Sequence, residues 1–303
     1  MRIYSHTACL DHHPGAAHAE RPQRLQAVTE ALRGAFPDMP WLQAPLATRE
    51  QLLRVHDQAL LALVLDTPVD GPIALDPDTV LGPGSPEAAL RAAGAGVAAV
   101  DAVIDGGEDR VFCAVRPPGH HATGSIAMGF CLFNSIAVAA AHACQQHGLA
   151  RVAVVDFDVH HGNGTQAIFE ADPRVMYLSS HQLPLYPDTG RADERGVGNV
   201  LNVPLPPGAG SPEFREAWRK QLLPALDGFE PQLLLISAGF DAHRLDPLAQ
   251  LQLEADDFGW LTTELVDIAR RHGQGRVVSM LEGGYDLTAL RECSVAHVGA
   301  LAR

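Results

Sequence analysis

Cysteine is scarce in the 303-residue sequence, and its distribution excludes two kinds of site. The five cysteines are an odd number and lie far apart, without a Cys-x-x-Cys pair. This spacing favours neither a disulfide framework nor a zinc site built from thiolates. A reducing, cytoplasmic location is the expectation that follows.

Positive charge and long apolar runs are also in short supply. The chain has 22 Lys and Arg residues against 36 Asp and Glu residues, which gives a formal net charge of -14. Such a surface repels phosphate backbones and anionic lipid and favours a cationic partner or substrate. The apolar stretch 136–144 is too short to cross a bilayer, and the first ten residues predict a short strand rather than a signal peptide. We therefore expect no nucleic-acid partner and no membrane span.

The composition that remains is that of a globular α/β protein, with 47% hydrophobic and 19% charged residues. No linker-like segment divides the chain, so we expect one domain over residues 1–303. Short runs of Val, Leu and Ile alternate with helix-like segments, which predicts a parallel sheet covered on both faces. The predicted strands are 111–115, 152–155, 175–178, 233–237 and 277–281, and the predicted helices are 88–104, 135–147, 214–226 and 256–272.

A polar cluster follows each of the five predicted strands. In open parallel sheets, ligands bind beyond the carboxyl ends of the strands, where the loops converge. We therefore expect all five clusters to share one site. They are 116–121, 156–161, 179–181, 239–243 and 282–286.

Three residues in these clusters suit a metal ion. Asp158 and His160 are two positions apart after a strand, so an extended backbone points both side chains to one face, and Asp241 adds a second carboxylate. Two carboxylates and an imidazole suit zinc, and three protein ligands leave a position for water, which is typical of a catalytic site. Asp-x-His alone is more often a solvated loop pair, so the prediction depends on the other clusters.

The paired histidines His120 and His121 follow a stiff Pro-Pro-Gly turn. Beside activated water, one imidazole can accept a proton while the other supplies positive charge. A carboxylate partner for one imidazole and an amide partner for the other would separate their pKa values. Asp156 and Asn163, which flank the metal motif, are the candidates for these partners. Taken alone, a His-His pair on a loop is more often a surface feature.

Tyr285 follows two glycines, which let the backbone come close to a site. Its phenol could donate a hydrogen bond to the oxyanion of a tetrahedral intermediate. The alternative for an isolated Gly-Gly-Tyr is an aromatic side chain packed over the strand end.

These motifs together resemble the histone deacetylase superfamily, in particular its class II branch and the bacterial amidohydrolases related to it. The resemblance runs from His18 to Leu287. It implies a three-layer arginase-deacetylase fold with a central parallel sheet of about eight strands. The motifs are Arg116-Pro-Pro-Gly-His-His121, Gly129-Phe-Cys-Leu-Phe-Asn134, Asp156-Phe-Asp-Val-His-His-Gly-Asn-Gly-Thr165, Ser237-Ala-Gly-Phe-Asp241 and Glu282-Gly-Gly-Tyr-Asp-Leu287.

The resemblance also assigns roles to individual residues. It implies zinc at Asp158, His160 and Asp241, with His121 as general base and acid. It makes His120 the electrostatic partner and Tyr285 the donor to the substrate carbonyl, and it places Asn163 on the class II side. Further positions that it implies are Gly129, Phe130 and Tyr186 in an acyl-lysine tunnel and Arg24 beside an internal cavity for acetate.

A structural monovalent cation, usually potassium, is implied as well. The first site would use backbone carbonyls of Asp156, Asp158 and His160 with Ser179 nearby. The second site would involve Phe169, Asp172 and Val175.

Several functions stay open at this point. Leu248 stands where polyamine-selective relatives carry a glutamate, which favours N6-acetyl-lysine over acetylpolyamine or another small amide. His243 and Arg244 would make the rim of the site more basic, unless both point to solvent. A non-hydrolytic acyl-lysine binder and an arginase-like dimetal hydrolase are further alternatives. The latter needs an acidic residue where His243 stands.

Overall fold

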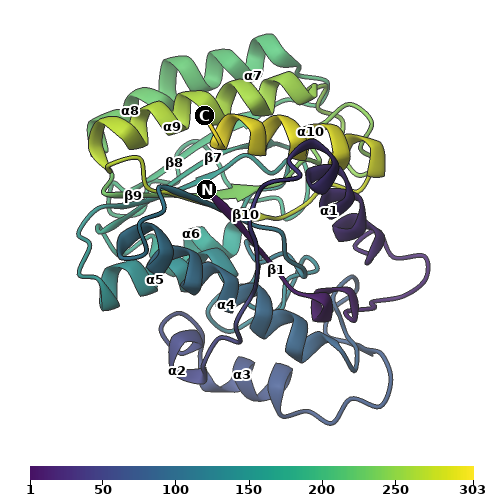
Figure 1. The fold of residues 1–303 in the computed structure, drawn as a ribbon. Helices are drawn as coiled ribbons and strands as arrows, with labels where there is room; N and C mark the ends of the chain where they lie inside the picture. The colour runs from purple at the N-terminus through teal and green to yellow at the C-terminus, as the bar shows by residue number, and fades with distance from the viewer.

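Residues 1–303 are all described by the structure, a computed structural model, and they build an eight-stranded sheet between two layers of helices (Figure 1). The strand order is β2-β1-β5-β10-β9-β6-β7-β8, and every pairing in this sheet is parallel. The predicted α/β class and parallel sheet are confirmed. The strands are β1 Arg2–Ser5, β2 Trp41–Gln43, β5 Arg110–Cys113, β6 Val152–Asp156, β7 Val175–Gln182, β8 Val200–Leu205, β9 Leu233–Ala238 and β10 Val277–Leu281.

Helices cover both faces of the sheet, as Figure 1 shows. One layer contains α1 Gln23–Ala35, α7 Ser211–Ala217, α8 Leu223–Phe229, α9 Ala255–His272 and α10 Leu287–Leu301. The other contains α4 Ser85–Ile104, α5 Ser135–Gln146 and α6 Asn163–Phe169, with α2 Arg49–Leu52 and α3 Gln58–Leu65 outside them. The remaining elements are a 3₁₀ turn, Thr7–Leu10, a π turn, Trp218–Leu222, and a small antiparallel hairpin of β3 Ile73–Ala74 and β4 Val80–Leu81. No helix has both the length and the apolar character needed to cross a membrane.

The central strands are buried along their whole length because helices pack on both sides. Every residue of β6, β9 and β10 is buried. Removing a Val, Leu or Ile side chain from water contributes about 1.5–3 kcal/mol, so these strands carry much of the folding free energy. They also hold the loops at their carboxyl ends in fixed positions.

Two predicted elements differ from the structure in ways that have a physical reason. Strand β7 does not stop at Leu178, because pairing with β8 carries it on to Gln182, so Ser179 and His181 lie inside the strand. The helix expected over 214–226 is interrupted by a π turn at Trp218–Leu222. Pro224 lacks the N–H that an α-helical bond to the preceding turn requires, which accounts for the wider turn there.

A buried histidine in this fold predicts acid sensitivity. His297 of α10 lies between Thr262 Oγ1 at 2.6 Å and Ser279 Oγ at 2.7 Å, and burial lowers its pKa to about 3. The unfolded chain takes up this proton below about pH 6.5 while the native chain does not, so stability falls as pH decreases through that value. We expect His297→Gln to reduce the slope of unfolding free energy against pH by up to about 1.4 kcal/mol per unit between roughly pH 6 and 4. Urea unfolding at several pH values measures this slope, and an unchanged slope would contradict the expectation.

Candidate active site

Four of the polar clusters follow strands that are neighbours in the sheet. Strands β5, β10, β9 and β6 lie side by side in this order, so the loops after them meet at one edge. The fifth cluster, at 179–181, belongs to the adjacent strand β7. The topology therefore brings residues that are far apart in sequence to a common site.

Asp158, His160 and Asp241 form a buried group whose ligand atoms all lie within 4.8 Å of one another. His160 Nδ1 is 3.0 Å from Asp158 Oδ1 and 3.2 Å from Asp241 Oδ2. Asp158 and Asp241 are 0–1% exposed. This geometry makes the group a candidate metal site.

The backbone orients both carboxylates toward this group. Asp158 Oδ2 accepts the N–H of Gly283 at 2.8 Å, and Asp241 Oδ1 accepts the N–H of Val159 at 2.8 Å. Asp241 Oδ2 is left facing His160. Burial lowers the pKa of His160, but Asp158 and Asp241 outweigh burial and raise it to about 10. The donor set fits a divalent cation, because two carboxylates and one imidazole balance its charge and three ligands leave it open to substrate.

The paired histidines have different partners. His120 Nδ1 lies 2.9 Å from Asp156 Oδ2, and His121 Nδ1 lies 2.8 Å from Asn163 Oδ1. The two rings are 4.0 Å apart. These are the carboxylate and amide partners expected from the sequence.

The pKa values of the two imidazoles shift in opposite directions. Burial lowers the pKa of His120, but the carboxylates of Asp156 and Asp158 outweigh burial and raise it well above its usual value. Burial lowers the pKa of His121 too, and positive charge on His120 and His160 lowers it further, well below its usual value. The pair therefore combines a charged imidazole with a neutral one that can accept a proton.

Glu282 fixes the turn that carries these histidines, a function that the sequence did not predict. Its Oε2 accepts the N–H groups of Gly119 at 2.6 Å and His120 at 3.2 Å. Its other oxygen receives the Ser237 hydroxyl at 3.2 Å, and burial raises the pKa of the carboxyl to about 7. Glu282 begins a motif noted in the sequence, but only the fold shows what its side chain contacts.

Tyr285 is held from several sides. Its N–H donates to Asp246 Oδ2 at 2.7 Å, the Arg24 guanidinium lies 4.8 Å from its ring, and Phe130 packs edge-on at 5.7 Å. Burial raises the pKa of the phenol well above its usual value, so the hydroxyl remains a donor. Arg24 also donates at 2.5 Å to the carbonyls of Glu282 and Gly284, which places it behind Tyr285 and outside the pocket lining.

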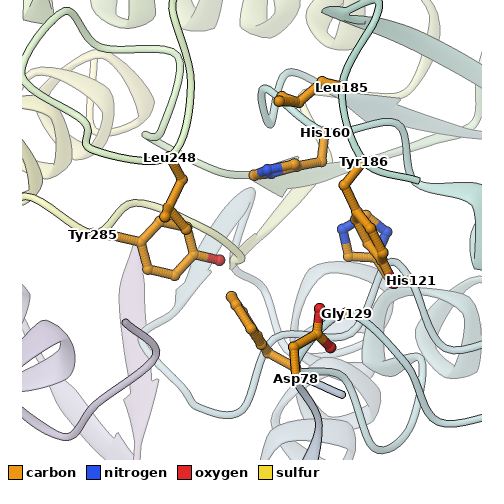
Figure 2. A pocket seen from close by; sticks show the side chains of 9 residues that line it. Asp78, His121, Gly129, His160, Leu185, Tyr186, Leu248 and Tyr285 are labelled. Carbon is orange, nitrogen blue, oxygen red and sulfur yellow. The ribbon is translucent and has the colours of Figure 1, made fainter. Parts of the chain in front are cut away.

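These groups face a pocket of about 220 Å³. Figure 2 shows the Tyr285 hydroxyl and the His160 ring pointing into the same space, with His121 and Tyr186 on the opposite side from Tyr285. The lining includes Gly129, Phe130, Tyr186 and Leu248, which the sequence placed at the substrate. It adds two residues that were missed, Asp78 and Leu185. It consists of Asp78, His121, Gly129, Phe130, His160, Leu185, Tyr186, Leu248 and Tyr285.

Gly129 allows the wall of the pocket to lie directly against His121. A Cβ at this position would meet two atoms of the His121 ring at 2.5 and 2.7 Å, and the backbone has φ +57°. Phe130 follows with φ 66°, and its N–H donates to Thr79 Oγ1 at 3.0 Å. His18 packs edge-on against the Phe130 ring at 4.7 Å. This wall is therefore fixed by contacts from the β3–β4 hairpin and the first loop.

His243 and Arg244 do not line the pocket. His243 is 1% exposed, and Arg244 is ion-paired with Glu254 Oε1 at 2.5 Å on the surface. The basic rim considered from the sequence is therefore absent from the pocket lining.

The residues implied in cation binding lie on β6, β7 and the segment between them. Ser179 is paired in register with Asp156 across the two strands. The carbonyl oxygens of Phe169, Asp172 and Val175 converge, and each accepts a hydrogen bond from the side chain of Asn199.

Comparison with known proteins shows the family of the chain. The family model described as "Histone deacetylase domain" matches residues 18–301. The chain belongs to the histone deacetylase family. The histone deacetylase-like amidohydrolase of Pseudomonas aeruginosa is 42% identical over 294 residues, covering 94% of this chain and 77% of that protein. The human polyamine deacetylase HDAC10 is 40% identical over 291 residues, covering 90% of this chain and 43% of that protein.

The fold agrees with a solved structure of the same family. The crystal structure of the HDA15 HD domain superposes with a TM-score of 0.92 at 36% identity, covering 99% of this chain and 88% of that chain. Membership in this histone deacetylase family identifies the chain as a hydrolytic deacetylase or amidohydrolase.

Proposed function

We propose that this deacetylase is a zinc enzyme that hydrolyses N-acyl amines, with N6-acetyl-lysine in proteins or peptides as the leading substrate. One observation carries the proposal: His160 of the candidate metal group, the neutral His121 and the Tyr285 hydroxyl line the same narrow pocket. A nucleophile activator, a proton acceptor and an oxyanion donor are the groups that amide hydrolysis requires.

Each residue has a separate task in this mechanism. Zinc held by Asp158, His160 and Asp241 would supply a Lewis acid for the carbonyl and for water. His121 accepts the proton of the attacking water and returns it to the leaving amine. His120, charged beside Asp156, stabilises the negative charge that develops, and Tyr285 donates to the oxyanion.

The lining of the pocket supports an extended cationic amine as the substrate. Phe130, Leu185, Tyr186 and Leu248 supply apolar surface for an aliphatic chain, and Asp78 supplies a carboxylate. Leu248 offers no charge to a second amine of a polyamine, which favours acetyl-lysine. Acetylpolyamine remains the second candidate because Asp78 could pair with an amine and because a relative is named as a polyamine deacetylase.

We further propose that residues 1–303 work as one catalytic domain, since loops from both halves of the sheet contribute to this pocket. The five cysteines are buried and unpaired, which supports the proposed reducing, cytoplasmic location.

A turnover panel tests the proposed function. Acetyl-lysine peptides, longer acyl-lysines, trifluoroacetyl-lysine and acetylpolyamines are compared in protein with a measured metal content. We expect kcat/KM for acetyl-lysine peptides to exceed that for acetylpolyamines by at least roughly tenfold. A chelator should abolish turnover, added zinc should restore it, and a hydroxamate should inhibit.

The other outcomes distinguish the alternatives. Faster turnover of acetylpolyamines would replace the substrate assignment but leave the chemistry in place. Binding of acyl-lysine without turnover in zinc-loaded protein would indicate a binding protein. Two metal ions per chain would indicate an arginase-like site.

A further inference from the structure

Asn199 lies at the point where three backbone carbonyls converge, just before β8. Its Nδ2 is 2.7 Å from the carbonyl oxygen of Phe169, 3.0 Å from that of Asp172 and 2.8 Å from that of Val175. The side chain is buried, with the residue 6% exposed. One amide nitrogen therefore faces three oxygens, from the last residue of α6, the loop after it and the first residue of β7.

The chemistry of these contacts fixes the orientation of the amide. Carbonyl oxygens only accept hydrogen bonds, so the group facing them must be the NH₂ rather than the oxygen. The Asn199 oxygen in turn accepts the N–H of Val197 at 3.2 Å. A Cβ at Gly196 would come within 2.6 Å of this oxygen, so glycine leaves the space that the amide needs. Both ends of the amide are thus matched to their surroundings.

The same three carbonyls are those that the family resemblance assigned to a second potassium ion. Converging carbonyl oxygens bind potassium by replacing its hydration shell. Here the Asn199 nitrogen lies within 3.0 Å of all three oxygens, so its N–H groups face them in the place of an ion. The residues present therefore do not fit a cation at this place.

We propose that Asn199 substitutes for the second monovalent cation and that this chain binds at most one such ion, at the Asp156 and Ser179 site. Asn199 also links the start of β8 to β7, since its backbone carbonyl accepts the N–H of Tyr177 at 2.9 Å. The Asn199 side chain thus joins these carbonyls as a bound ion would, but it is covalently attached to the chain. This inference does not depend on the substrate or on zinc.

Counting bound cations tests the proposal. Protein is dialysed to equilibrium against rubidium chloride, a potassium analogue, and the bound rubidium is measured by elemental mass spectrometry. We expect at most one equivalent in the wild type and one additional equivalent in Asn199→Ala, where the amide nitrogen no longer lies among the three carbonyls. Asn202→Ala removes another buried asparagine, three residues further along in β8, and should add none.

Thermal unfolding gives a second readout. In choline chloride Asn199→Ala should have a lower melting temperature than the wild type. Replacing choline chloride with potassium chloride at equal ionic strength should raise the melting temperature of Asn199→Ala more than that of Asn202→Ala. Asn199→Asp places a carboxylate oxygen among the carbonyls, so its melting temperature should depend on potassium even more strongly. This variant replaces Asn199→Ala in the test if the alanine variant does not fold. Two equivalents of rubidium in the wild type, or no added equivalent and no added potassium response in the Asn199 variants, would overturn the proposal.

Discussion

Tyr285→Phe should lower kcat by about 10²–10³, or roughly 3–4 kcal/mol, because it removes one preorganised donor to the oxyanion. The ring position should persist without the hydroxyl, since Asp246 holds the backbone N–H at 2.7 Å and Arg24 and Phe130 hold the ring. The Tyr285 hydroxyl bonds less strongly to the neutral carbonyl of the bound substrate than to the oxyanion that forms from it. The loss should therefore appear in kcat more than in KM.

Steady-state kinetics at saturating substrate, with metal content measured on the same samples, checks this expectation. Tyr186→Phe is the matched control, because Tyr186 also lines the pocket but is 39% exposed. Its turnover should stay close to that of the wild type. Full activity in Tyr285→Phe would show that the phenol has no catalytic role. A loss explained by missing metal would assign Tyr285 to the stability of the metal group instead.

The part of the site that the sequence predicted comes from strand ends. Apolar runs such as Leu233–Ala238 are easy to recognise because both faces of the strand are buried, and the polar residues that follow are then known to meet at one edge. Asp158, His160 and Asp241 were found in this way, and the structure brings them together.

The elements that were missed lack such a pattern. Strand β8 contains Asn202 and Pro204, which interrupt its apolar run, and proline is tolerated there because β8 is at the edge of the sheet. Asp78 lies on a hairpin far along the chain from every strand-end motif, so only the tertiary fold shows that it reaches the pocket. The contacts of Asn199 likewise depend on a loop geometry that no periodicity reports.

Gly283→Ala should have the largest effect, because it changes the metal group without removing a ligand. A Cβ at Gly283 would lie closer than 3.0 Å to Asp241 Oδ2 and to Asp158 Oδ2. The N–H of Gly283 also donates to Asp158 Oδ2 at 2.8 Å, so the backbone cannot move away without losing this bond. The carboxylates must shift instead. Metal sites tolerate deviations of only about 0.2 Å in ligand distance, so metal affinity should fall by at least roughly 100-fold, and turnover should fall with it.

Titration of the metal-free variant with zinc, followed by activity measurement at each step, measures this loss. Gly34→Ala on helix α1 is the control, because a Cβ there meets nothing within 4 Å and alanine favours a helix. It should bind zinc as the wild type does. If Gly283→Ala bound zinc normally and turned over substrate normally, the metal would have to lie elsewhere than between Asp158, His160 and Asp241. If it bound zinc normally but lost turnover, the close approach of Gly283 would serve the position of Tyr285, two residues further along, rather than that of the ligands.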